Sequence, residues 1–491
     1  MRGKSILSLL VLTVLLIITG LAGPGCATIV PPQGGAKDSL PPVLVRVNPA
    51  DKTTGFSTNR VIFTFDEYIE LDNYTQNVIV SPVPSSFPTV TRKLNTINVK
   101  LRDTLEENTT YSINFGRSIK DLNEGNIYQD FTYVFSTGRY IDSFQFRGNI
   151  VIAETGGVDT TLTVLLHRSS DDSVVFKERP RYVTKTDGTG AFVFKNLPPD
   201  TFYIYALKDA GGSYRYQNKE ALFAFASAPV VVGDSTPRLT LYAYDLPAPP
   251  TKPAPAGGGK KKTADRIKYT TVMKEKQGLT DSFMFVFEVP LASFDSSKIH
   301  LTVDSSYTPV TGYSFSQDTL AKNLTIKYPW KPNSYYNLIL EKDFATDTLG
   351  QQLLIPDTIS FYSRSLEEYS KLNLRFRNLD LSVNPVLQLL VNNEVAYAFP
   401  LTGVTLNQDL ILPGDYSLRL LEDRNRNGIW DPGVFPGARI QPELVRPLER
   451  KLQIKANTNF PIELDLNARE VQKKPGVQPT GPAGGNNRLR R

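Results

Sequence analysis

The sequence predicts an all-β protein made of tandem β-sandwich modules, placed behind a signal peptide and a Pro/Gly tether. Three observations support this fold class. Among 491 residues there are 26 Phe and 23 Tyr, which suit the half-buried surface of a sheet, and 33 Gly and 35 Pro, which supply turns. Short runs of alternating apolar residues recur along the chain, separated by turn residues. Finally, the motifs of the first half return in the same order in the second half.

The N-terminus has the order of an export signal. Arg2 and Lys4 give a positive start, residues 6–18 are apolar and uncharged, and small residues lead to Cys26. The apolar run is shorter than the roughly 20 residues that span a bilayer. We therefore predict that residues 1–25 are removed as a signal peptide.

Cys26 is the only cysteine, so the chain cannot form an internal disulfide. A chance cysteine at a cleavage site is one interpretation. The alternative is acylation, because the site resembles the lipobox of bacterial lipoproteins, with Gly25 before the cysteine, although Gly23 stands where Leu is common. That resemblance implies lipidation of Cys26, a membrane partner reached through the lipid anchor, and a place in the cell envelope, most simply at the outer membrane. Several acyl chains on one residue would hold the protein durably.

Composition shifts predict the domain boundaries. The segments are a signal peptide (1–25), a lipid anchor and tether (26–42), a first β module (43–140), a second β module of a different kind (141–246), a Pro/Gly/Lys linker (247–266), a further module of the first kind (267–366), a further module of the second kind (367–470) and a disordered tail (471–491). Net charge is +6, but the basic runs fall in the linker and the tail. Since the folded stretches mix both signs and no nucleic-acid motif is present, a nucleic-acid partner is not expected.

The first folded stretch contains at least six strand-like runs. In NRVIFTFDEYI, Val61, Phe63 and Phe65 alternate with Ile62 and Thr64, which is typical of a strand with one buried face. The runs NVIVSP, TINVKL, TYSINFG and FTYVFSTG follow, each bounded by turn residues. Short strands at this spacing favour a sandwich.

The same stretch resembles the bacterial Ig-like domain of S-layer and other surface proteins. The features that carry the resemblance are NPAD at residues 48–51, the strand 62–65 followed by Asp66-Glu67, Leu105, TTY at 109–111, Asp121, Gly125-Asn126 and FTYVFST at 131–137. The resemblance covers roughly one hundred residues. It implies a binding or spacer module and no chemistry.

Residues 141–246 have a different sequence pattern. In TKTDGTGAFVFKNLPPDTFYIYALKD, Asp187-Gly188 and Gly190 predict a tight turn before Phe192 and Phe194. A second turn, LPPD at 197–200, precedes a further strand. This pattern resembles the transthyretin-like module that accompanies some carboxypeptidases and many surface lipoproteins, which implies an accessory sandwich and not a catalytic part.

The second half repeats these motifs. Phe283, Phe285 and Phe287 match the first aromatic strand, PNSYY at 332–336 matches NTTY at 108–111, and DTLG at 347–350 matches the segment 121–125. LPGDY at 412–416 then matches the turn at 197–200. Any two β domains share some such features, but the preserved order favours duplication of a two-module unit.

No catalytic constellation is apparent, so we predict that the chain is not an enzyme. Only His167 and His300 could serve as imidazole bases, and each lies alone in a strand pattern. No G-x-S-x-G elbow, P-loop or dinucleotide fingerprint occurs. Neighbouring acids such as Asp66-Glu67 would point to opposite faces of a strand, which does not make a catalytic dyad.

The predicted function is that of a non-catalytic envelope lipoprotein with a structural or binding role, as an adhesin or scaffold, with an envelope protein or a glycan as partner. An alternative is a carbohydrate-binding accessory lipoprotein of a surface system, for which Tyr214, Tyr216, Phe223 and Phe225 are the best local stacking residues. Core packing explains the two phenylalanines more simply. An unrecognised hydrolase is a third, weaker hypothesis.

One segment, DRNRNGIWDPG at 423–433, has the spacing of a calcium loop. With Asp423 first, Asn425 is third, Asn427 fifth, Ile429 seventh through its carbonyl, and Asp431 ninth. Val434 stands at position twelve, where an EF-hand has Glu, and no helix pattern flanks the loop, so an acid from elsewhere would have to complete the shell; Glu422 and Glu443 are the candidates. The competing interpretation is an Asx-rich turn with Trp430 packed beneath it. The only cofactor expected is thus a structural Ca²⁺.

Overall fold

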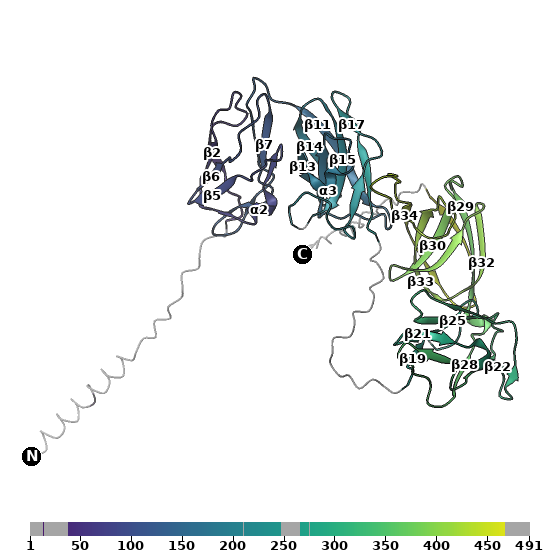
Figure 1. The fold of residues 1–491 in the computed structure, drawn as a ribbon. Helices are drawn as coiled ribbons and strands as arrows, with labels where there is room; N and C mark the ends of the chain where they lie inside the picture. Colours follow the sequence, from purple (N-terminus) through teal and green to yellow (C-terminus); the bar gives the residue numbers. More distant parts are fainter. Residues whose placement is uncertain (1–12, 14–37, 210, 247–265, 274, 467–491) are drawn as a thin grey trace, which may run out of the picture. The chain divides into compact units, whose positions relative to one another are not determined.

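A computed structural model describes residue 13 and residues 38–209, 211–246, 266–273 and 275–466 (Figure 1). The chain divides into two compact units, Met1–Ile141 and Asp142–Arg491. The first unit holds one β-sandwich, the first module. The second unit holds three, called the second (β11–β18), third (β19–β28) and fourth (β29–β35) modules. Cys26 and the predicted tail lie outside the described residues, as do nearly all of the predicted signal peptide and linker and residues 26–37 of the tether.

The first module contains ten short strands and one short helix. Its elements are β1 (Leu44–Asn48), β2 (Arg60–Phe65), β3 (Ile69–Leu71), α2 (Tyr74–Asn77), β4 (Ile79–Ser81), β5 (Thr89–Lys93), β6 (Thr96–Lys100), β7 (Thr110–Asn114), β8 (Ile119–Asp121), β9 (Ile127–Tyr128) and β10 (Thr132–Ser136). One sheet has the order β1-β2-β6-β5 and another the order β10-β7-β4, with β3-β8-β9 beside them. All the strand pairs are antiparallel.

The side chains of β2 alternate between buried and more exposed positions, as the sequence predicts. Val61, Phe63 and Phe65 are buried in the core between the sheets, whereas Ile62 and Thr64 are only half-buried. The ring of Phe63 meets those of Phe115 and Tyr133 edge to face, with centroids 5.2 and 5.4 Å apart. Each such pair adds about 0.5–1.5 kcal/mol beyond the burial itself. The all-β, sandwich-forming prediction is confirmed.

The third module repeats the strand order of the first. Its elements are β19 (Tyr269–Thr271), β20 (Phe283–Phe287), β21 (Leu291–Phe294), η1 (Ser296–Lys298), β22 (Ile299–Val303), β23 (Thr308–Pro309), β24 (Ser314–Gln317), β25 (Asn323–Lys327), β26 (Tyr335–Leu340), β27 (Ala345–Asp347) and β28 (Asp357–Tyr362). The sheet β19-β20-β25-β24 corresponds to β1-β2-β6-β5, and β22-β26-β28 to β4-β7-β10. Figure 1 shows these strands in green.

The repetition extends to a side-chain network at one end of both modules. The Tyr111 hydroxyl accepts a hydrogen bond from the Glu106 backbone N–H at 2.9 Å, and the Tyr336 hydroxyl accepts one from the Lys331 N–H at 3.0 Å. In both cases the tyrosine bonds back to the residue five positions earlier. The motif that the sequence repeats is therefore a structural corner, which closes the loop before strands β7 and β26.

The repeated aspartates also have a structural role. Asp121 is almost fully buried and accepts hydrogen bonds from the backbone N–H groups of Glu124, Gly125 and Asn126. Burial acts to raise the pKa of this carboxyl, but the N–H donors outweigh it and hold the pKa below the usual value. Asp347 accepts from the backbone N–H groups of Leu349 and Gln351 in the same way.

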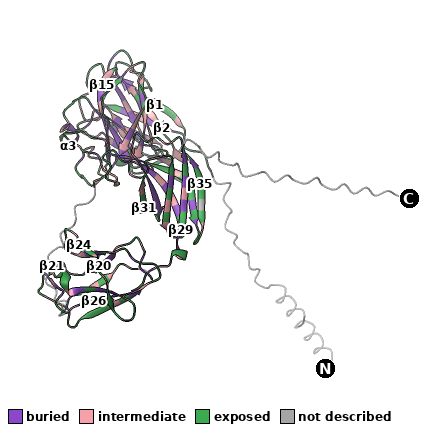
Figure 2. Cartoon of the chain, turned by 90° about the vertical axis from the view of Figure 1, so that its right-hand side faces the viewer, coloured by how far each residue is buried: buried purple, intermediate pink, exposed green. Residues whose placement is uncertain are grey.

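The second module is a sandwich of a different kind. Its elements are β11 (Phe144–Ile152), β12 (Leu162–His167), α3 (Val174–Lys177), β13 (Tyr182–Lys185), β14 (Ala191–Leu197), β15 (Asp200–Lys208), β16 (Phe223–Phe225), β17 (Val230–Val232) and β18 (Leu239–Ala243). One sheet is β14-β11-β18, in which β11 and β18 run parallel; the other is β13-β12-β15-β16, with β17 also on β15. In Figure 2 the strands around β15 are drawn largely in the purple of buried residues.

The fourth module repeats that topology after the short helix η2 (Leu366–Glu368). Its strands are β29 (Ser370–Arg377), β30 (Pro385–Val391), β31 (Glu394–Pro400), β32 (Thr405–Ile411), β33 (Gly414–Glu422), β34 (Leu444–Ile454) and β35 (Asn459–Asp465). One sheet is β32-β29-β35, with β29 and β35 parallel, and the other is β31-β30-β33-β34. The two kinds of sandwich thus alternate along the chain, as the predicted duplication requires. The resemblance of this second kind to transthyretin-like modules stays a prediction.

Candidate functional site

The predicted calcium loop is an ordered turn between β33 and β34. The Asp423 carboxylate, which is buried, accepts hydrogen bonds from the backbone N–H groups of Asn427 at 3.2 Å and Gly428 at 2.7 Å. Gly428 has a φ of 77°, in the left-handed region that glycine adopts without strain, which is why the sixth position of the loop is glycine.

The two asparagines close the loop onto Asp431. The side-chain amides of Asn425 and Asn427 donate to the same Asp431 oxygen, at 2.7 and 2.8 Å. Their carbonyl oxygens accept from the backbone N–H groups of Asn427 and Ile429. The side chains at positions three, five and nine are therefore joined by hydrogen bonds, and the carboxylate at position one accepts from the backbone N–H of position five.

Glu443 is the acid that reaches this loop from outside it. Its two carboxylate oxygens accept from the backbone N–H groups of Arg424 and Asp431, at 2.7 and 3.2 Å, and it is 3% exposed. Burial raises the pKa of the Glu443 carboxyl, and the charges of Asp423 and Asp431 add to the rise, although the two N–H donors oppose it. Glu422, the other candidate, lies in β33 opposite Leu444.

Trp430 anchors the loop from below. Its indole N–H donates to the Glu443 carbonyl at 2.8 Å, and its ring packs on the buried side chains of Val386, Leu421 and Val445. The Asx-rich turn over a packed tryptophan is thus present, with every carboxylate supplied with N–H donors. A calcium ion would have to compete with those donors, and the calcium assignment stays a prediction. Among the residues that the structure describes, no group of three or more His, Cys, Asp or Glu side chains is arranged to hold a metal ion.

The histidines lie in two different modules. His167, at the end of β12, is buried with its ring edge-on to Tyr205, and desolvation lowers its pKa to about 4. His300 is exposed on β22, with Nε2 2.8 Å from a carboxylate oxygen of Glu341. Within the described part of the chain neither imidazole has a hydrogen bond to a serine hydroxyl, so neither is placed as the base of a nucleophile.

The aromatic side chains proposed for sugar stacking are mostly interior. Tyr216, Phe223 and Phe225 are buried, and the rings of Tyr216 and Phe223 stack with centroids 4.1 Å apart. Tyr214 is half-buried. The two phenylalanines and Tyr216 are therefore packed against other aromatic side chains and are not exposed for sugar stacking.

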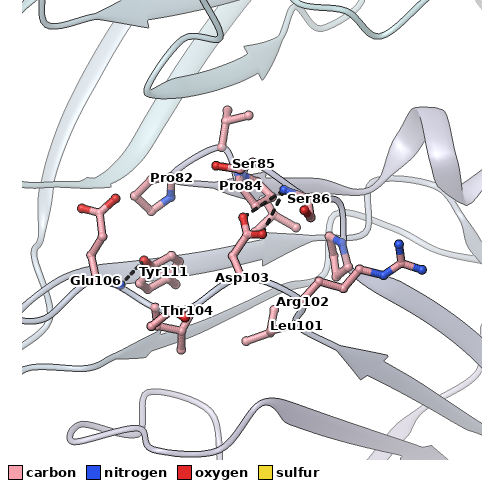
Figure 3. Close-up of a pocket in the computed structure, with 14 residues that line it drawn as sticks. Pro82, Pro84, Ser85, Ser86, Leu101, Arg102, Asp103, Thr104, Glu106 and Tyr111 are labelled. Atoms are coloured by element: carbon pink, nitrogen blue, oxygen red, sulfur yellow. Dashed lines mark hydrogen bonds between the residues drawn. The ribbon is translucent and has the colours of Figure 1, made fainter.

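A cleft lies in the first module (Figure 3). It is lined by a proline-rich loop (Pro82, Pro84 and Pro88) and by the segment from Leu101 to Glu106. The Asp103 carboxylate spans the cleft and accepts from the Ser86 backbone N–H at 3.0 Å, and the Tyr111 hydroxyl at its edge is held by Glu106. These two contacts hold together the loops that line the cleft.

The family comparison concerns the first module. Residues 38–137 match the family described as the bacterial Ig-like domain. The matched range ends at the closing strand β10, and it covers about a fifth of the chain. The resemblance stated from the sequence is confirmed for this module.

Solved structures give only distant likenesses. The Bacillus anthracis TIE protein is 11% identical over 89% of this chain and 75% of its own, with a TM-score of 0.16. BcpA, the major pilin subunit of Bacillus cereus, is 9% identical over 66% of this chain and 99% of its own, with a TM-score of 0.17. The N-terminal part of the bacterial S-layer protein SbsC is 15% identical over 42% of this chain and 45% of its own, with a TM-score of 0.15. At TM-scores this low the likeness carries no argument about function. No curated protein matches the chain.

Proposed function

We propose that the chain is a non-catalytic, lipid-anchored protein of the cell envelope that acts as a structural or binding scaffold. The observation that carries the proposal is the Ig-like domain at residues 38–137, whose strand order and tyrosine corner recur in the third module. Polar side chains that could do chemistry, such as Asp121, Asp423 and Glu443, instead accept bonds from the backbone. Such modules are suited to holding binding surfaces at a set spacing.

The anchor belongs to the same proposal. Acylation of Cys26 would tie the chain to a membrane, with the outer membrane as the expected site, and an envelope protein or glycan is the expected partner. In the described residues no helix is long and apolar enough to cross a bilayer. A structural Ca²⁺ in the loop at 423–431 is also part of the proposal, as an ion that would pin the loop between β33 and β34.

The proposal can be tested by capture from envelope membranes. Membranes holding the tagged full chain are cross-linked, and bound protein and glycan are identified with and without an excess of the purified soluble chain that starts after Cys26. A scaffold should give a partner that the soluble chain displaces. Absence of any displaced partner, together with turnover of envelope peptides or glycans by the purified chain, would contradict the proposal.

A further inference from the structure

A small hairpin leaves the fourth module between the calcium-type loop and β34. Val434 and Ile440 pair through two backbone hydrogen bonds, of 2.8 and 3.1 Å, and the five residues from Phe435 to Arg439 form its tip. This hairpin, called the latch hairpin below, lies outside the two sheets of its own module. Its side chains contact the second module instead.

Phe435 is seated among aromatic side chains of the second module. Its ring centroid lies 5.0 Å from that of Phe223, 5.1 Å from Phe225, 5.6 Å from Tyr205 and 6.1 Å from Phe176. Distances of this size are those of packed aromatic pairs. One side chain of the fourth module thus completes an aromatic cluster that belongs to the second.

Arg439 adds a polar clamp beside that ring. Its guanidinium forms an ion pair with Asp172 and donates to the Ala226 carbonyl at 2.7 Å. The same group lies over the rings of Phe225 and Phe435, 5.4 and 5.7 Å from their centroids. Both charged side chains of the pair are at least three-quarters buried, so this contact is less screened than a surface ion pair.

The second module has a second apolar face, on the side of its β12-β15 sheet that points away from the main core. In β12 every residue is buried: Leu162, Val164 and Leu166 face the main core, while Leu165 and His167 face the other way. Helix α3 and Tyr216 cover part of this second face, as Val175 and Tyr216 are also buried. Phe435 fills the remaining part, over the outer side of β15 and β16.

Further contacts continue along β34. The Val445 N–H donates to the Ala153 carbonyl at 2.8 Å, and the Arg419 guanidinium donates to the Glu154 carbonyl at 3.0 Å. Gly433 lies so close to Tyr244 that a Cβ there would come within 2.6 Å of the ring. Backbone, polar and apolar contacts therefore act together over one continuous surface.

The base of the hairpin is fixed by the loop described above. The Glu443 N–H donates to the Asp431 carbonyl at 3.0 Å, and Trp430 is bonded to the Glu443 carbonyl. The residues that enter and leave the hairpin are thereby held together. A preformed hairpin loses little conformational entropy on docking, which favours tight binding.

From this geometry we infer that the contact surface centred on the latch hairpin holds the fourth module to the second without the covalent linker at 247–266. The partner it fits is an aromatic socket with an adjacent carboxylate, made by Phe223, Phe225, Tyr205 and Asp172. This goes beyond the proposed function, because it makes two modules that are not neighbours in sequence one rigid body. The two halves of the chain would then stay together after the linker is cut.

The test uses the full soluble chain with a specific protease site inserted between Gly258 and Gly259. After complete cleavage, the two fragments should elute as one complex in size-exclusion chromatography at micromolar concentration. Fragments that separate in the otherwise unchanged chain would overturn the inference.

Two variants locate the binding in the hairpin. Phe435→Ala and Arg439→Ala should each weaken the association of the cut halves by about 30-fold or more, as central aromatic and arginine residues of an interface do. Val395→Ala is the matched control, since Val395 is an exposed aliphatic residue on β31 of the same module, and its halves should remain associated. Unchanged association in both hairpin variants would contradict the assignment.

A charge exchange separates binding from folding. Asp172→Arg should release the halves, and the double variant Asp172→Arg with Arg439→Asp should restore part of the association. Rescue of this kind cannot come from misfolding of either module. A double variant no better associated than Asp172→Arg alone would show that the ion pair does not hold the halves together.

Discussion

Burial of a single imidazole couples the second module to pH. His167 is 4% exposed at the end of β12, and its pKa is lowered to about 4 from an ordinary value of 6.5 by desolvation. In the unfolded chain the same group takes up a proton near pH 6.5. The folded module therefore binds fewer protons between these values, and its stability falls as pH drops through that window.

The expected loss of stability from pH 7 to 4 is on the order of 3 kcal/mol for this one group. It can be measured as the pH dependence of hydrogen exchange at the β12 and β15 amides. His167→Phe should flatten this dependence, whereas His300→Gln, at an exposed histidine, should leave it unchanged. An equal pH dependence in wild type and His167→Phe would contradict the account.

The calcium loop gives a second prediction at this scale. If Ca²⁺ binds, millimolar calcium should raise the melting temperature of the fourth module, because an ion that binds only the folded state stabilises it. Asp423→Ala and Asp431→Ala should abolish the rise, and Asp380→Ala, at an exposed turn acid of the same module, should not. No heat on calorimetric titration and no shift in melting temperature would leave the hydrogen-bonded turn alone.

At the scale of elements, close backbone approach limits what a strand accepts. Gly148 lies in β11 between its two partners, and a Cβ there would come within 2.3 Å of the Leu239 carbonyl oxygen and 2.5 Å of the Phe192 ring. Neither the strand backbone nor the buried ring has room to move. Glycine is therefore required for the β14-β11-β18 sheet.

Gly148→Ala should destabilise the second module by about 1–3 kcal/mol, the usual cost of overpacking a core. Gly188→Ala is its control, because a Cβ at that turn position meets nothing within 4 Å. Loss of hydrogen-exchange protection at the β11 and β18 amides would measure the effect. Equal protection in the two variants would show that the sheet can adjust.

Local sequence patterns were sufficient to predict a strand and its buried side chains where one face of the strand is buried and the other is more exposed to solvent. The alternation at residues 61–65 identified β2 and its inward side chains, and the repeated Phe283, Phe285 and Phe287 identified β20. In the loop from Asp423 to Asp431, the amides of Asn425 and Asn427 both donate to Asp431, whereas the predicted calcium site stays a prediction.

Contacts between residues far apart in the sequence could not be predicted from such patterns. The burial of Phe223 on the outer side of its sheet depends on Phe435, which lies more than 200 residues further along the chain. A run such as LTVLLH shows that a strand is apolar on both faces, but not what covers the second face. The sequence does hold one signal of the latch hairpin. A large aromatic residue, Phe435, and an arginine, Arg439, occur in a turn-rich segment where exposed polar residues would be expected.

At the scale of the whole molecule, a pair of β-sandwich modules occurs twice along the chain, and the proposed envelope scaffold adds a lipid anchor before them. The two kinds of module alternate, and their strand orders repeat from the first half to the second. The proposed role is to present binding surfaces, and the proposed position in the envelope rests on acylation of Cys26.

The central claim is that the protein is held in the envelope by acylation of Cys26. The most direct test combines membrane fractionation of the protein with mass spectrometry of its N-terminal peptide. In the wild-type chain, Cys26 should be the first residue and carry acyl chains, and the protein should remain with washed outer membranes. Cys26→Ser should remove the acyl mass and move the protein to the soluble envelope fraction, with the modules still folded. An unmodified N-terminal peptide in wild type, or a Cys26→Ser protein that stays with the membrane, would contradict the account.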